Sequence, residues 1–295
     1  MVISVVVCSY NARDVIDRSL SSLREQDIED PFEVIVVDSG SDGTADRVRS
    51  SYPEVRLVRS EERLWPGPAR NAGLRAATGT YVAFLPADGV AKPDWLRRRV
   101  AAHREGYAAI GGSITNGTPR HPVGTAGYFL EYSALIPSDR VLAEQAIPHC
   151  LSYERALFDR LGDFPEGAET GEDTVFNERL LEAGVEIGFD ERAQLDHLNL
   201  NGVGPYLRHQ YGHGRGLAQC VERYGLQSPI GAPEQGRAVA ALRMFGLYPA
   251  RRWWAALRRI ARGRPAWGVA YVALTPLIWA GLWATSLGAW QEWRR

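Results

Sequence analysis

Cysteine is scarce in this sequence. The 295 residues include only Cys8, Cys150 and Cys220, and no two of them form a CxxC pair. Three widely spaced thiols argue against a disulfide framework and against a zinc site built on cysteine. The chain is long enough to bury a sizeable apolar core, and we expect it to fold in a reducing compartment.

Glycine-rich phosphate-binding motifs are also missing. The segment Cys8–Arg13 follows the first apolar run and contains no glycine, so the fingerprint GxGxxG is absent, and so is GxxxxGK[ST]. These absences argue against a Rossmann dehydrogenase, a P-loop NTPase and a sugar-nucleotide pyrophosphorylase. A bound diphosphate would therefore need a metal ion and arginines to balance its charge.

The chain has little net charge, but the charge is unevenly distributed. The formal total is −1, and residues 251–295 carry eight arginines and one acid, which leaves −8 for residues 1–250. No basic leader precedes the apolar run Met1–Val7. We therefore expect this run to be a strand rather than a signal peptide.

Strand and helix patterns alternate over the first 115 residues. Short runs rich in β-branched and aromatic residues predict strands at Val2–Cys8, Phe32–Val37, Val55–Val58, Tyr81–Leu85 and Ala108–Ile114. Helices are expected between them and at Asp173–Ala183 and Tyr206–Tyr224. Residues 116–170 show no regular pattern. The alternation predicts an α/β fold with a doubly wound, mainly parallel sheet flanked by helices.

Two aspartates come directly after predicted strands. Asp38 follows Val34–Val37, and Asp88 follows the run that begins at Tyr81. In parallel sheets, ligands bind beyond the carboxyl ends of the strands. We therefore expect one polar site there that holds a cation and a hydrogen-bonding group.

Four motifs occur in order at Val5–Asn11, Val34–Thr44, Gly67–Gly73 and Gly79–Gly89. They resemble the motifs of family 2 glycosyltransferases, and the resemblance extends from about Val2 to Arg215. It implies the GT-A fold, a nucleotide-diphosphate sugar donor, a divalent metal ion (Mn or Mg) and inversion of the anomeric centre. We expect a catalytic domain over residues 1–215, a helical connector over 216–250 and a basic, apolar, membrane-associated segment over 251–295.

The resemblance also implies which residues bind the nucleotide sugar. In the N-terminal motifs these are Ser9, Tyr10, Asn11, Asp38, Arg70 and Ala87. Asp38 would accept the N–H of the base, because an ionised carboxylate is only an acceptor and forms strong charge-assisted bonds. Arg70 would lie beside the base or a phosphate. A turn aspartate is the alternative for Asp38.

Asp88 corresponds to the last acid of the family's Asp-x-Asp motif, which implies that it contacts the metal ion. The first acidic position is Pro86 in this chain. His197 resembles a histidine that follows the last core strand in relatives and contacts metal or diphosphate, and imidazole suits such a role. A turn aspartate and a structural histidine are the alternatives.

Glu172 and Asp173 open a predicted helix and resemble the family's Glu-Asp motif. The resemblance implies that Asp173 is the general base that deprotonates the acceptor hydroxyl, with Glu172 beside it. The helix N-terminus lowers the pKa of Asp173 and Glu172 raises it, so we expect Asp173 to be ionised at neutral pH. An acidic first turn that complements the helix dipole is the alternative.

The segment Arg208–Arg215 resembles a flexible segment behind the family's site. There Arg208 and Arg215 would neutralise the departing diphosphate. Three glycines, Gly212, Gly214 and Gly216, would let the segment move as a lid. A solvated arginine face explains the pattern equally well.

The C-terminal segment has the pattern of a membrane-associated region. Arg251–Ile260 predicts an amphipathic helix with Trp253, Leu257 and Ile260 on one face, which is typical of helices on anionic lipid. Residues 265–291 contain no charged residue, and about 20 apolar residues span a bilayer core. A bent span, a re-entrant hairpin and a helical pair packed on the catalytic domain are the alternatives. We expect the protein at the cytoplasmic face of the cell membrane, peripheral or with one C-terminal span.

The sequence thus predicts an inverting glycosyltransferase of the hexosyltransferase type. Its acceptor would be a hydroxyl group, lipid-linked or part of a cell-envelope glycan, and no nucleic acid is involved. The alternative is a non-catalytic, membrane-attached protein that binds a nucleotide sugar or a glycan, and Pro86 motivates it.

Overall fold

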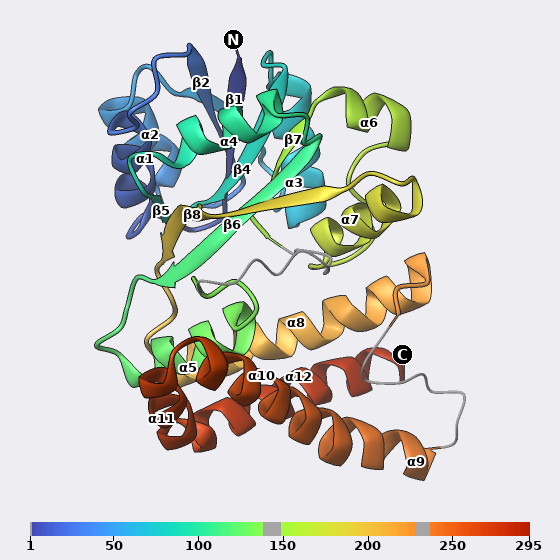
Figure 1. Cartoon of the computed structure of the whole chain (residues 1–295). Helices are drawn as coiled ribbons and strands as arrows, with labels where there is room; N and C mark the ends of the chain where they lie inside the picture. Colours follow the sequence, from blue (N-terminus) through green and yellow to red (C-terminus); the bar gives the residue numbers. More distant parts are fainter. Residues whose placement is uncertain (1, 138–148, 228–236) are drawn as a thin grey trace. The chain divides into compact units, whose positions relative to one another are not determined.

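The computed structural model describes residues 2–137, 149–227 and 237–295 (Figure 1). The chain forms two compact units. Unit 1 comprises Met1–Thr115, Val141–Glu166 and Glu172–Leu198, and unit 2 comprises Asn116–Arg140, Gly167–Gly171 and Asn199–Arg295. This division differs from the expected boundaries at residues 215 and 250, because helix α8 (Val203–Tyr224) continues through residue 215.

An eight-stranded sheet forms the centre of unit 1, in the order β3-β2-β1-β4-β7-β6-β8-β5. Its strands are β1 (Ile3–Ser9), β2 (Phe32–Asp38), β3 (Arg56–Arg59), β4 (Tyr81–Pro86), β5 (Gly89–Ala91), β6 (Ala109–Asn116), β7 (Ser152–Glu154) and β8 (Ile187–His197). The strands β3, β2, β1 and β4 pair in parallel, as predicted. The pairs β4–β7, β7–β6 and β8–β5 are antiparallel, so the parallel half is extended by an antiparallel half.

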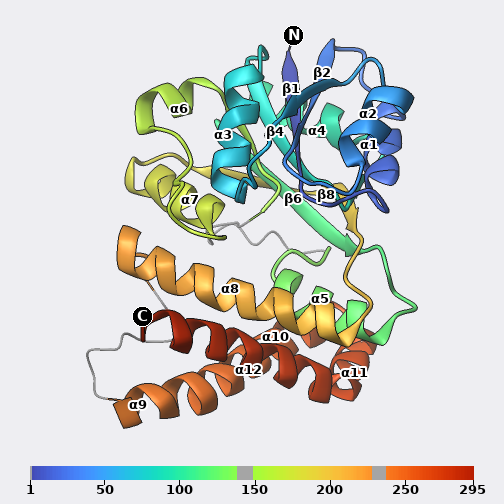
Figure 2. The ribbon, with the colours of Figure 1, turned by 180° about the vertical axis from the view of Figure 1, so that it is seen from behind.

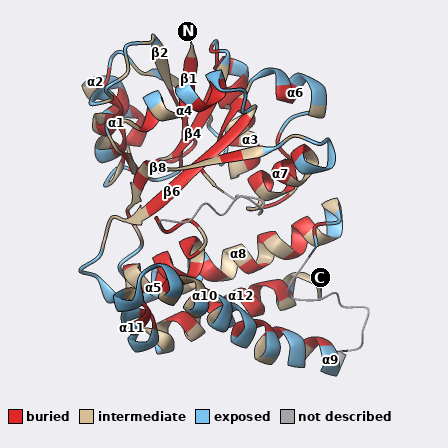
Figure 3. Ribbon diagram, viewed as in Figure 1, coloured by how far each residue is buried: buried red, intermediate tan, exposed pale blue. Residues whose placement is uncertain are grey.

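Helices flank the sheet of unit 1. They are α1 (Ile16–Arg24), α2 (Thr44–Ser51), α3 (Pro66–Ala76), α4 (Trp95–Arg104), α6 (Ala156–Leu161) and α7 (Glu172–Glu182). The two views place α3 and α4 on opposite faces of the sheet (Figures 1 and 2). Small residues let α3 approach closely, because a Cβ atom at Gly73 would lie 2.2 Å from Cγ1 of Val6 in β1. The central strands β1 and β4 are mostly buried, whereas β3 and much of β8 are half-buried (Figure 3).

Unit 2 consists of helices in its described residues. They are α5 (Pro122–Tyr132), α8, α9 (Arg237–Leu242), a π-helix (Arg243–Leu247), α10 (Tyr248–Gly263), α11 (Pro265–Ala273) and α12 (Thr275–Glu292). Helices α8 and α12 pack along one another, and α5 contacts both (Figure 1). Helix α5 lies in the stretch where the sequence shows no regular pattern.

Two of the three glycines predicted to make α8 flexible are packing positions in the structure. The helix is continuous from Val203 to Tyr224. A Cβ atom at Gly214 would lie 1.9 Å from the Thr285 carbonyl oxygen, and one at Gly216 would lie 2.3 Å from Cγ2 of Thr170. In this structure the three glycines of the expected lid lie within one helix, and two of them pack it closely against its neighbours; the lid stays a prediction.

The C-terminal helices only partly match the expected membrane segment. In the described part of the chain, no single helix has the length and apolar character needed to cross a membrane, whereas α11 and α12 together do, as a pair bent by 70°. The apolar face of α10 packs on α11 and α12: Ile260 is 2% exposed, and Trp253 Nε1 donates a hydrogen bond to Thr275 Oγ1 at 3.1 Å. The apolar face of α10, whose pattern is typical of helices on anionic lipid, therefore contacts protein in this structure.

Candidate active site

The carboxyl ends of parallel strands bring the N-terminal motifs together. Ser9 at the end of β1 is in register with Asp38 at the end of β2, and Cys8 is in register with Pro86 of β4. Strand β3 places Arg59 opposite Asp38 on the other side. The predicted site residues of β1, β2 and β4 therefore share one edge of the sheet.

Asp38 is a buried carboxylate with specific donors. It is 1% exposed and accepts hydrogen bonds from Arg59 Nη1 at 3.1 Å and from the Gly40 amide at 3.4 Å. Burial raises the pKa of Asp38, although Ser9, the Gly40 amide and Arg59 oppose the rise. Because a carboxylate offers about four acceptor sites, Asp38 retains capacity for a further donor.

The loops after β1 and β2 contact one another through a hydrogen bond and a close backbone approach. The Ser41 amide donates to Asn11 Oδ1 at 2.8 Å, and Asn11 adopts a positive φ of 51°. A Cβ atom at Gly40 would lie 2.4 Å from the Asn11 nitrogen, so only glycine allows this approach. Tyr10 keeps 45% of its surface exposed, with the Arg63 guanidinium 4.3 Å from its ring centroid. Tyr10 thus presents an aromatic face on a rigid loop.

Arg70 of α3 joins the two carboxylates at the start of α7. Its Nε lies 3.0 Å from Glu172 Oε1, and its Nη2 lies 3.4 Å from Asp173 Oδ2. His149 Nδ1 lies 3.3 Å from the same Asp173 oxygen, and the Thr174 amide donates to Asp173 Oδ1 at 2.8 Å. Both carboxylates are nearly fully buried. The structure therefore places Arg70 against the predicted catalytic pair.

The two carboxylates differ in their pKa values. Burial raises the pKa of Glu172, and the charge of Asp173 adds to the rise against the effect of Arg70. Burial also acts to raise the pKa of Asp173, but Arg70, His149 and the Thr174 amide outweigh it and bring this pKa well below its usual range. Asp173 is therefore ionised at neutral pH, the state a general base requires.

Asp88 and His197 form the predicted ligand pair. Antiparallel pairing sets Gly89 of β5 opposite His197 of β8, and the Leu198 amide donates to the Asp88 carbonyl oxygen at 2.8 Å. As a result, His197 Nε2 lies 3.4 Å from Asp88 Oδ1. The Asp88 side chain is 40% exposed and that of His197 is 12% exposed. Ala87, immediately before Asp88, is largely buried.

Two thiols of unit 1, the buried Cys150 and the half-buried Cys8, respond to the charged groups of the candidate site. Burial raises the pKa of Cys150 to about 12, and this thiol also feels the charges of Arg70, Asp173 and Asp88. Burial likewise raises the pKa of Cys8 to about 12, with further effects from Arg70 and Glu172. Arg70, Asp173 and Asp88 thus all contribute to the electrostatic environment of Cys150 in unit 1.

The two arginines predicted to neutralise the diphosphate belong to unit 2. Arg208 is exposed on α8. Arg215 is already paired, with Nη2 2.9 Å from Glu169 Oε1 and Nε 2.9 Å from Glu292 Oε2. Their role toward a diphosphate stays a prediction.

Three residues near the site were not singled out in the sequence: Arg59, Arg63 and His149. Arg59 directly follows a predicted strand, and the rule that identified Asp38 and Asp88 also identifies it. His149 lies in the stretch without periodicity and has a positive φ of 78°, so no sequence pattern marks it.

The chain is similar to known proteins. The model of the family "Glycosyl transferase family 2" matches residues 4–162. The succinoglycan biosynthesis protein ExoO of Rhizobium meliloti is 37% identical over 99 residues, which are 33% of this chain and 28% of ExoO. Glycosyltransferase AglE of Haloferax volcanii is 25% identical over 228 residues, 74% of this chain and 73% of AglE. The match thus spans less than a third of ExoO and about three quarters of AglE.

A solved structure shares the fold. The mannosyltransferase PcManGT from Pyrobaculum calidifontis superposes with a TM-score of 0.65 at 22% identity, covering 98% of this chain and 87% of that one. The sheet flanked by helices is therefore of the GT-A type, as the resemblance implies. Since the family model matches more than half of the residues, the chain belongs to glycosyl transferase family 2.

Proposed function

We propose that unit 1 catalyses the inverting transfer of a sugar from a nucleoside-diphosphate donor to a hydroxyl group. The contacts of Arg70 with Glu172 and Asp173, together with the pair formed by Asp88 and His197, carry this proposal. They give unit 1 a cation, an ionised carboxylate and a metal-ligand candidate. PcManGT, which shares the fold, was solved with GDP-Man and Mn²⁺, and this supports a donor of the same class.

The nucleotide portion would bind at the edge formed by β1 and β2. Asp38 would accept a charge-assisted hydrogen bond from an N–H of the base. Tyr10 offers a face for stacking, and the loop with Ser9 and Asn11 surrounds the base and ribose. Ala87 would lie beside the donor next to Asp88.

The donor set of Asp88 and His197 fits a divalent metal ion. A carboxylate oxygen and an imidazole nitrogen 3.4 Å apart match the spacing of two ligands on one ion, and this mixed pair suits ions such as Mn²⁺. The partial exposure of Asp88 leaves room for diphosphate oxygens as further ligands. When bound, the ion would supply charge neutralisation for the leaving diphosphate.

Asp173 is the general base of the transfer. The acceptor oxygen attacks the anomeric carbon opposite the diphosphate, the bond from that carbon to the diphosphate oxygen breaks, and the diphosphate leaves with the electron pair. Asp173 takes the proton of the acceptor hydroxyl. Arg70 and His149 hold Asp173 ionised beforehand, and Glu172 fixes the opposite side of the Arg70 guanidinium.

Unit 2 would place the enzyme on the cytoplasmic face of the membrane. It exposes apolar side chains next to arginines: Trp254 is 49% exposed, Val269 is 74% exposed and Val272 is 50% exposed. Exposed aromatic and aliphatic residues among cationic ones favour an anionic lipid surface. An acceptor that is lipid-linked or part of a cell-envelope glycan would follow from this location.

Calorimetric titration with nucleoside diphosphates, with and without Mn²⁺, tests the donor site. We expect Mn²⁺ to tighten binding of the cognate nucleotide at least tenfold, about 1.4 kcal/mol. The substitution Asp88→Ala should abolish this gain, whereas Asp163→Ala, which changes an exposed aspartate of the same unit, should preserve it. A Mn²⁺ effect of equal size in the Asp88→Ala protein contradicts the assignment of Asp88.

A further inference from the structure

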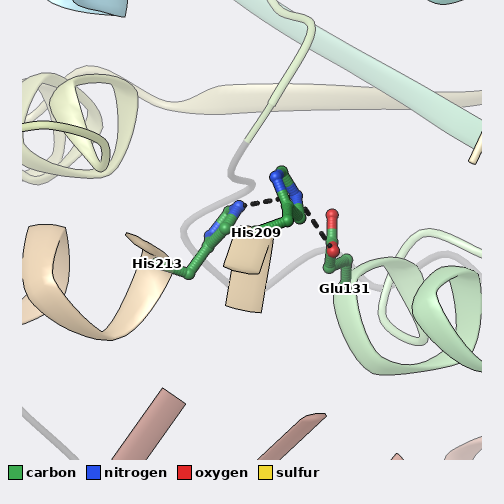
Figure 4. Close-up of side chains that lie close together, drawn as sticks. All are labelled: Glu131, His209 and His213. Atoms are coloured by element: carbon green, nitrogen blue, oxygen red, sulfur yellow. Dashed lines mark hydrogen bonds and ion pairs between the residues drawn. The ribbon is translucent and has the colours of Figure 1, made fainter. Parts of the chain in front are cut away.

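A second group of metal-ligand side chains lies in unit 2 and includes none of the residues assigned to the donor. Glu131 comes from α5, and His209 and His213 stand one turn apart on α8 (Figure 4). The three side chains point toward one another (Figure 4). One potential ligand atom from each lies within 4.8 Å of the other two.

The distances suit a single cation. His209 Nε2 lies 3.0 Å from His213 Nε2 and 3.3 Å from Glu131 Oε1. Two ligands bound at about 2.0–2.2 Å to one tetrahedral zinc ion lie about 3.3–3.6 Å apart. Small side-chain rotations would therefore bring all three atoms into coordination distance.

Hydrogen bonds among Glu131, His209 and His213 pair these three groups less well than a shared metal ion would. If Nε2 of His209 carries a proton, it must share one N–H between the Glu131 carboxylate and His213. If it carries none, its lone pair faces the carboxylate. A metal ion accepts a lone pair from each of the three groups at once.

The carboxylate is held in place by a buried neighbour. Gln210 is 3% exposed and donates from Nε2 to Glu131 Oε1. Its own Oε1 lies 3.4 Å from the Thr285 hydroxyl of α12. Such outer hydrogen bonds orient ligating carboxylates in metal sites.

We propose that Glu131, His209 and His213 bind a divalent transition-metal ion of the Zn²⁺ type. Two histidines at i and i+4 present both imidazoles on one helix face, and a carboxylate from a second helix completes a three-ligand set. The His209 side chain is 42% exposed, which gives the ion access and leaves the fourth position to water or a small ligand. The ion joins α5 to α8.

The test uses the chain of 295 residues carrying Asp88→Ala, so that the donor-site ligand is removed. After treatment with a chelator, Zn²⁺ affinity is measured by competition with a chromophoric chelator, and Co²⁺ absorption reports a tetrahedral site. We expect one equivalent of Zn²⁺ to bind and to raise the melting temperature. Adding His213→Ala should weaken binding at least tenfold and abolish the rise.

The matched control is His121→Ala, which changes an exposed histidine of the same unit and should leave Zn²⁺ affinity unchanged. Circular dichroism and melting in metal-free buffer verify that each variant folds. Equal Zn²⁺ affinity with and without His213→Ala overturns the proposal, and so does a failure of the Asp88→Ala protein to bind Zn²⁺.

Discussion

Arg70 determines the charge balance of the candidate active site. Its side chain is 16% exposed and contacts two buried carboxylates. The pKa of Arg70 is raised because Glu172 and Asp173 outweigh the effect of burial, so it stays charged. Without this cation, two neighbouring carboxylates would share a buried region, and at least one of them would take up a proton. Arg70 therefore controls which form of Asp173 is present.

A second buried titratable residue governs how stability depends on pH. His103 is 3% exposed, with Nδ1 2.7 Å from the Tyr107 carbonyl oxygen and Nε2 2.9 Å from Ser152 Oγ. A neutral ring that donates from Nδ1 and accepts at Nε2 satisfies both contacts. Burial, aided by Arg99, lowers the pKa of His103 to about 4 despite the Tyr107 contact.

The free energy of unfolding should therefore fall in mild acid. Between pH 7 and pH 5 the unfolded chain binds a proton at His103, whose unfolded pKa is near 6.5, and the folded chain does not. The stability present above pH 6.5 is then lost by about 2 kcal/mol at pH 5, with the loss levelling off below pH 4. Urea unfolding at several pH values measures this slope. A slope unchanged by His103→Gln would show that other groups cause it.

The rule that ligands bind beyond the carboxyl ends of parallel strands predicts some of the site residues and leaves others undetermined. Asp38 and Asp88 end neighbouring runs, so their common edge could be predicted. The contact of Arg70 with Asp173 joins residues 103 positions apart, and it depends on how α3 and α7 pack. No local pattern contains that information.

Among the helices, the crossing of α8 and α12 depends on glycine. The Gly214 backbone is close to the Thr285 carbonyl, whereas nothing lies within 4 Å of a Cβ atom at Gly212. Glycine appears in both positions, but only Gly214 is required by packing. The sequence alone does not distinguish these two glycines.

Alanine at the two positions should have opposite effects. Gly214→Ala forces α8 from α12 and should lower the free energy of unfolding by about 1–3 kcal/mol. Gly212→Ala adds helix propensity without a clash and should raise it by up to about 1 kcal/mol. Chemical denaturation of both variants gives the comparison. Similar destabilisation by both substitutions would rule out the tight crossing.

Long periodic elements could be predicted, and short or joined ones could not. The strands β1, β2 and β4 and the helices α7 and α8 lie within a few residues of their predicted bounds. The strands β5 and β7 have three residues each, too few for a period. The sequence shows one strand pattern at Val185–Phe189 and another short one at Ala193–His197. In the structure they form one strand, β8, because it continues through residues that carry no strand signal.

At the scale of the whole molecule, the charge is divided along the chain. Residues 1–250 carry −8, and the last 45 residues carry +7. A basic, apolar segment beside an acidic remainder favours orientation at an anionic surface. The exposed Trp254 has the Arg258 guanidinium 4.9 Å from its ring centroid. An apolar ring and a positive charge therefore lie together at this position.

The protein should therefore sediment with vesicles that contain anionic lipid, and less so as salt increases. Trp254→Ser should weaken this partitioning about tenfold, because it removes an exposed anchor. Leu181→Ser changes a similarly exposed apolar residue of unit 1 and should have no effect. Equal partitioning of the Trp254→Ser protein and the wild type would exclude this surface as the contact.

The most direct measurement compares single-turnover sugar transfer by the wild type, Asp173→Asn and Asp163→Asn, with a donor identified by the nucleotide titrations. Asp173→Asn keeps the shape of the side chain and removes its ability to take a proton. We expect its rate to fall at least tenfold, about 1.4 kcal/mol of barrier, with donor affinity nearly unchanged and with Asp163→Asn at the wild-type rate. Transfer by Asp173→Asn at the wild-type rate would contradict a general base at this position.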